Sequence, residues 1–186
     1  MPLDVTLTLS DADLDYFRAV MQAASERGNG RDEAETVRAA ARVVERLHGS
    51  TRSPYILRRL DRVARLVQML EDPQWQLPAL ERRRVLDGLA YVAEARDLVP
   101  DDVPALGLLD DAIMLELVLA ELQHELEAYE EFDDYRTTET ARAAARTVSR
   151  DDWLDARRQA LHARMRERRQ RDLARLGGDL QPIMRF

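Results

Sequence analysis

Apolar residues recur three and four positions apart along most of the chain, which is the spacing that places them on one face of an α-helix. Turn and capping residues separate these stretches. The pattern predicts helices over the following ranges: 10–27, 32–48, 53–72, from Pro78 onward, 110–132, 139–148 and 151–176. Residues 4–9 alternate between polar and apolar like a short strand, which must either pair with a second copy of itself or lie as an extended arm.

We therefore expect an all-α fold: a bundle of about five core helices with a central helix–turn–helix hairpin and an arginine-rich C-terminal helix. The polar pair Thr137-Thr138 is taken as a break, which divides the chain into a helical domain, 1–136, and an extension, 137–186. The apolar stripe of the last helix thins out after Met165, so we expect this helix to project from the body or to pack on a partner.

The composition limits the classes of protein to which this chain can belong. With 45% hydrophobic and 34% charged residues over 186 positions, the chain has enough apolar material for a core. It has no cysteine, which excludes disulfides and thiolate metal sites. A net charge of −7 argues against general nucleic-acid binding, and no DNA partner is expected. No run of 18 apolar residues or signal-peptide pattern is found, so we expect a cytoplasmic location, with membrane association as an alternative.

Charge is unevenly spread along the chain. From Asp87 to Asp134 the only basic residue besides histidine is Arg96, whereas the last helix is rich in arginine. This asymmetry permits head-to-tail contact, either within one chain or between two, and makes a protein partner or self-association the expectation. A peripheral anionic membrane or RNA is the alternative, through a set of arginines on the last helix. These are Arg157, Arg158, Arg164, Arg168 and Arg169. His162, on the same helix, is expected to face solvent.

The central hairpin carries the most specific motif. Seven residues stand in the register Asp, Pro, Asp, Pro, Gly, Asp, Asp, namely Asp97, Pro100, Asp101, Pro104, Gly107, Asp110 and Asp111. On these residues the chain resembles the YkvA-like family, a bacterial domain of unknown function, and weaker similarity extends over about 5–136. The resemblance implies a helical fold and, in many members, a predicted membrane association, but no established activity.

Physical chemistry gives this motif a structural role first. The two prolines and the glycine force the chain to reverse, and Asp110 or Asp111 is expected to cap the following helix. Asp97 and Asp101 are expected to bind turn amides or the arginines Arg59 or Arg62. One alternative is a hard-cation site for Mg²⁺ or Ca²⁺, since four aspartates gather around one turn. Another is an interaction surface for an arginine-bearing partner.

Two Glu-x-x-His pairs, Glu45 with His48 and Glu121 with His124, match the ligand spacing of di-iron helical bundles. Bridging glutamates have no clear candidates, so iron is not expected and these are interpreted as ordinary helix residues. No nucleophile motif or phosphate-binding glycine loop is found, and catalytic residues are predicted to be none. The sequence favours a non-catalytic helical protein-interaction module, with a divalent-metal-binding protein and a peripheral membrane-associated protein as alternatives.

Overall fold

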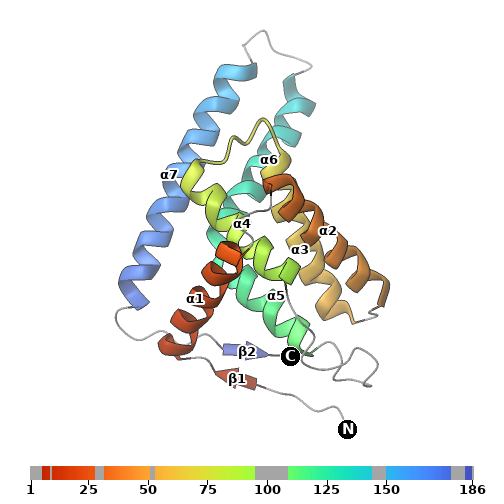
Figure 1. Ribbon diagram of the computed structural model, residues 1–186. Coiled ribbons are helices and arrows are strands. Elements are labelled where there is room, and N and C mark those ends of the chain that lie inside the picture. Colours follow the sequence, from red (N-terminus) through yellow and green to blue (C-terminus); the bar gives the residue numbers. More distant parts are fainter. Residues whose placement is uncertain are drawn as a thin grey trace.

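The computed structural model describes residues 6–8, 10–27, 32–50, 53–94, 109–143, 150–176 and 183–185. Within these ranges seven α-helices form a helical bundle, and two three-residue strands make a small antiparallel pair, so the all-α prediction is confirmed (Figure 1). The helices are α1 (Asp11–Arg27), α2 (Glu33–Ser50), α3 (Pro54–Glu71), α4 (Ala79–Glu94), α5 (Leu109–Glu121), α6 (Gln123–Ala143) and α7 (Arg150–Leu176).

Local signals set the predicted helix starts. Ser10 and Asp13 form a reciprocal cap at the start of α1: the Ser10 amide donates to Asp13 Oδ2 at 2.8 Å, and the Asp13 amide donates to Ser10 Oγ at 3.3 Å. Ser53 is the N-cap of α3, with Pro54 in the first helical position. Both starts agree with the sequence pattern because the signals act within one helical turn.

The core lies where α3 and α4 meet the other helices. α4 packs against α1, α2 and α5, and α3 packs against α2, α5 and α6. Gly88 permits the close approach of α4 to α5, since a Cβ there would lie 2.8 Å from Leu122 Cδ1. Trp75 lies in the connection between α3 and α4, and its side chain is fully buried.

The predicted break at Thr137-Thr138 is wrong. α6 runs through both residues to Ala143, so the predicted helix over 139–148 is in part the end of α6, and 144–149 lie outside the described residues. Threonine lowers helix propensity only slightly, so two threonines do not end a helix whose preceding turns are held by buried residues up to Phe132. The predicted helix 110–132 is interrupted at Leu122, between α5 and α6, although hydrogen bonds Leu122 N to Val118 O and Leu126 N to Leu122 O bridge the interruption. The division of the chain into 1–136 and 137–186 stays a prediction.

α7 does not project from the body; it packs along α6 (Figure 1). Leu154, Leu161 and Met165 are buried and belong to the same hydrophobic core as the other helices. Beyond Met165 the described side chains of α7 are exposed or half-buried. The apolar stripe of α7 therefore does end at Met165. Beyond it, charged side chains rather than apolar ones join α7 to α6.

The predicted N-terminal strand exists, but its partner is neither a second copy nor solvent. Strand β1 (Thr6–Thr8) pairs antiparallel with strand β2 (Ile183–Arg185), near the ends of the chain, with Leu7 opposite Met184. The pair lies below α1 and α5 in Figure 1. The pairing of β1 with β2 depends on the tertiary structure, because a three-residue strand is too short for its sequence pattern to specify a partner strand.

None of the helices in the described ranges combines the length and the apolar character needed to cross a membrane.

Candidate functional site

A row of ion pairs joins α6 to α7. The two helices run antiparallel, so successive turns of α7 meet acids progressively earlier in α6: Arg164 pairs with Glu131, and Arg168 NH1 lies 3.1 Å from Glu127 Oε2. One turn further, Asp172 Oδ2 lies 2.8 Å from His124 Nε2. The acidic centre and the basic helix thus contact each other within one chain.

Two glutamates lie beneath this interface, Glu121, which is half-buried, and Glu125, which is buried. Glu121 binds Arg18 of α1 at 3.0 Å, Arg84 of α4 at 3.3 Å and Arg169 of α7 at 2.5 Å. Glu125, whose side chain is fully buried, lies 3.3 Å from Arg84 and 3.6 Å from Arg169. Its carboxylate oxygens accept no hydrogen bond in the structure. Burial raises the pKa of Glu125, and the Arg84 guanidinium opposes that rise.

This carboxylate–arginine network could not be read from the sequence. Arg84 is half-buried and Glu81 is buried, although both lie in a charged stretch whose pattern is typical of an exposed helix face. The partners Arg18 and Glu121 are 103 residues apart in the chain. An arginine every third or fourth position on α7 was the available signal, but it does not say which acid each arginine meets.

The two Glu-x-x-His pairs are not brought together. Glu45 is exposed, and His48 Nε2 lies 3.0 Å from Asp61 Oδ1 of α3. Glu121 binds arginines, and His124 binds Asp172. Across the described residues, no group of three or more His, Cys, Asp or Glu side chains is placed to hold a metal ion.

The hairpin motif lies largely outside the described residues: Asp97, Pro100, Asp101, Pro104 and Gly107 all fall between α4 and α5. Asp110 and Asp111 are in the first turn of α5, which begins at Leu109. The residues that precede Leu109 lie outside the described residues, so the capping role of Asp110 or Asp111 stays a prediction. Of the arginines expected to bind the hairpin, Arg59 pairs with Glu116 of α5.

His162 does not face solvent, contrary to the prediction. It is 6% exposed, and its ring meets Trp75 edge-on with 4.3 Å between ring centroids. Burial, together with the nearby guanidinium groups of Arg158 and Arg166, lowers the pKa of His162 to about 4. Burial of His162 could not be predicted, because a single histidine among arginines matches the pattern of an exposed helix face.

Acid should therefore destabilise the fold through His162. The unfolded chain binds a proton near the ordinary pKa of 6.5, whereas the folded chain binds it only near 4, so stability is lost as pH falls through this window. We expect His162→Phe to reduce the loss between pH 7 and 5 by about 1–2 kcal/mol. Urea unfolding at both pH values measures this. The exposed His48 supplies the control, His48→Gln, and equal pH dependence in both variants would contradict the assignment.

All five α7 arginines proposed from sequence to meet an anionic partner contact this chain's own groups. Arg164, Arg168 and Arg169 bind α6 or α5 glutamates, as above, and Arg157 lies 3.7 Å from Glu131. Arg158 NH1 donates to the Gln74 carbonyl at 2.9 Å. The exposed arginines in the second half of α7 are different ones: Arg171, Arg175 and Arg166, of which Arg166 Nε lies 3.7 Å from Glu81 Oε1.

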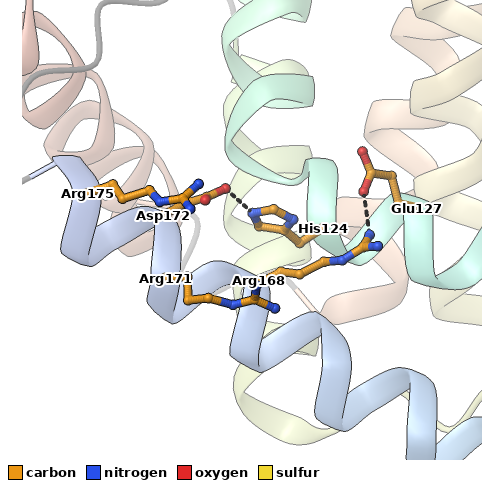
Figure 2. Close-up of a pocket in the computed structure, with 6 residues that line it drawn as sticks. All are labelled: His124, Glu127, Arg168, Arg171, Asp172 and Arg175. Atoms are coloured by element: carbon orange, nitrogen blue, oxygen red, sulfur yellow. Dashed lines mark hydrogen bonds and ion pairs between the residues drawn. The ribbon is translucent and has the colours of Figure 1, made fainter.

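Two hollows flank the exposed side of α6 and adjoin at Glu127. The first, of about 270 Å³, lies between α6 and α7 (Figure 2). Its lining residues are His124, Glu127, Arg168, Arg171, Asp172 and Arg175. The second, of about 350 Å³, lies between α3 and the α5–α6 segment. Its lining residues are Arg58, Arg59, Arg62, Glu116, Leu119, Ala120, Gln123 and Glu127.

Arginines from α3 and α7 thus form the two sides of one continuous face, which we name the arginine surface. Its six arginines are Arg58, Arg59, Arg62, Arg168, Arg171 and Arg175. Figure 2 shows the α7 side, where Arg168 reaches Glu127 and Asp172 reaches His124. The acids on this face are therefore already paired. Within the described residues, Arg58, Arg62 and Arg175 have no ion-pair partner, and Arg171 has only the exposed Glu167 at 3.6 Å.

No protein-family model, curated protein or solved structure matches this chain. The resemblance of the hairpin motif to the YkvA-like family stays a prediction.

Proposed function

We propose that the protein is a non-catalytic helical interaction module that binds an anionic partner at the arginine surface. One observation carries the proposal: six arginines line two adjoining hollows in a protein whose net charge is −7. Arginine side chains favour carboxylates and phosphates because the planar guanidinium donates two parallel hydrogen bonds. Potentials created by clustered charge act locally, so an acidic protein still attracts anions at such a face.

The internal ion pairs support a binding role for the outer arginines. Arg59 and Arg168 are held by Glu116 and Glu127, which fixes the walls of the hollows. The outer arginines stand on rigid helices at i, i+4 spacing, Arg58 with Arg62 and Arg171 with Arg175. Like charges at this spacing weaken a helix slightly, and a bound anion relieves that repulsion.

Chromatography on a sulfonate resin at pH 7 tests the proposal without knowledge of the partner. A protein with a sequence pI near 5.1 would pass through such a resin if its charge were evenly spread. We expect the wild type to be retained at low ionic strength and released by salt. The combined variant Arg58→Glu, Arg62→Glu, Arg171→Glu and Arg175→Glu should pass through.

The control variant carries the same kind of change elsewhere. Arg38 and Arg42 are exposed on α2 at the same i, i+4 spacing. Arg38→Glu with Arg42→Glu should leave retention nearly unchanged, whereas either outer pair reversed alone should reduce it clearly. Passage of the wild type through the resin, or an equal loss in the α2 variant, would overturn the proposal.

A further inference from the structure

We infer that the partner of the arginine surface is an acidic stretch of polypeptide rather than a nucleic acid or a lipid bilayer. The inference rests on the proposed function and names the class of partner. Four features of the described residues support it. They are the mixed charge of the surface, the size of its hollows, the burial of the apolar residues of α7, and the packing of Arg59 over the ring of Tyr55.

Carboxylates lie among the arginines of this surface. Glu116, Glu127 and Asp172 each line a hollow, so α5, α6 and α7 each contribute an acid to a face whose α3 side carries only arginines. A phosphate backbone carries one charge at every nucleotide and would bring phosphates against these acids. A polypeptide can place its acidic side chains opposite Arg58, Arg62, Arg171 and Arg175 and pass the carboxylates with neutral residues.

The hollows suit side chains of a peptide. Their volumes, about 270 Å³ and 350 Å³, lie near the lower end of the range for small-molecule sites, and the two hollows meet at Glu127 of α6. The α3-side hollow also contains Leu119, Ala120 and the exposed amide of Gln123. An amide side chain both donates and accepts hydrogen bonds, so it can pair with the backbone of an extended peptide.

A bilayer partner needs an apolar helix face at the surface. The apolar residues Leu154, Leu161 and Met165 of α7 are buried in the core. Among the described large apolar side chains of α7, Leu173 is the exposed one, at 49%. Helices that lie on membranes bury a full apolar stripe in the lipid boundary. The apolar stripe of α7 is instead buried in the core of the protein, so it is not available to lipid.

A single-stranded nucleic acid needs exposed aromatic faces for its bases. Tyr55, the aromatic residue of α3 beside the second hollow, is covered by Arg59, whose guanidinium carbon lies 3.3 Å from the ring centroid. Tyr129 and Phe132 of α6 are buried. The most exposed aromatic residue described, Tyr16, belongs to α1.

Fluorescence anisotropy with three labelled probes tests the inference on the full chain. The probes are an oligoglutamate peptide, an oligouridylate of matched charge, and phosphatidylserine vesicles. We expect saturable binding of the peptide that weakens as salt rises, with the other two probes binding at least about tenfold more weakly. An oligoglutamine peptide of equal length reports any contribution that does not depend on charge.

Variants place the binding on the arginine surface. Arg58→Glu with Arg62→Glu, and Arg171→Glu with Arg175→Glu, should each raise the Kd for oligoglutamate about tenfold. The α2 control pair should change it less than about twofold. Thermal unfolding of every variant should match the wild type, since these arginines are outside the core.

The outcomes separate the two claims. Retention on the sulfonate resin together with stronger binding of oligouridylate or of vesicles would overturn the polypeptide assignment and leave an anion-binding module. Failure of the resin experiment and of all three probes would overturn both. Peptide binding that is equally lost in the α2 control pair would show that the surface is not the site and would also overturn the inference.

Discussion

Trp75→Ala should reduce the free energy of unfolding by about 3–5 kcal/mol, which is one of the two largest effects we expect from a single substitution. Trp75 is fully buried although it lies in the connection between α3 and α4. Its ring centroid lies 5.1 Å from that of Phe132 and 5.8 Å from that of Tyr129, both on α6. On the α7 side it meets His162. Truncation would open a cavity at the junction of three parts of the fold.

The surrounding structure cannot easily close that cavity. Asp72, three residues before Trp75, accepts a hydrogen bond from Tyr129 Oη at 3.0 Å and binds Arg136 at 2.5 Å. These contacts hold the connection against α6, so collapse around a smaller side chain would strain them.

Urea unfolding followed by circular dichroism measures the loss. Trp75→Phe is the matched control, because it keeps an aromatic ring and the indole Nε1 has no hydrogen-bond partner in the structure. We expect Trp75→Phe to lose much less stability than Trp75→Ala. A loss below about 1 kcal/mol for Trp75→Ala would show that the connection does not contribute to the core as described.

Arg84→Met should destabilise the protein by a similar amount, about 3–5 kcal/mol at neutral pH. Arg84 is the guanidinium nearest to the buried Glu125, at 3.3 Å, and it also binds Glu121. Methionine keeps much of the apolar stem but leaves Glu125 with only the more distant Arg169. An ionised carboxylate that is buried without adequate compensation is costly, and this cost is the origin of the expected effect.

Two further measurements distinguish this cause from lost packing. Burial raises the pKa of Glu125, so its folded-state pKa lies above the unfolded value, and proton uptake favours the folded state. The stability difference between wild type and Arg84→Met should therefore narrow as pH falls. Glu125→Gln in the Arg84→Met background should recover part of the loss at neutral pH.

The neighbouring arginine supplies a control for Arg84→Met. Arg83 pairs with Asp87 on the exposed side of α4, and Arg83→Met should cost at most about 1 kcal/mol. Equal losses for the two variants, or a loss in Arg84→Met that does not change with pH, would contradict the assigned role of Glu125.

The sequence by itself determined the helical class and the starts of α1 and α3. Ser10 and Asp13 cap α1 by hydrogen bonds within one turn, and the fixed φ of Pro54 suits the first position of α3, so both starts can be read without knowing the fold. The apolar stripe of α7 could likewise be predicted from the spacing of its apolar residues, and Leu154, Leu161 and Met165 are all buried. The hairpin motif was legible as well, but most of it lies outside the described residues.

Only the tertiary structure decided what the charged residues do. It placed Glu125 and His162 inside, paired Arg169 with Glu121, and left Arg58, Arg62, Arg171 and Arg175 on one outer face. An arginine-rich helix has the same local pattern whether its arginines meet acids or solvent. Which of these happens depends on groups from other helices, and their approach is set by packing of the core rather than by neighbours in the chain.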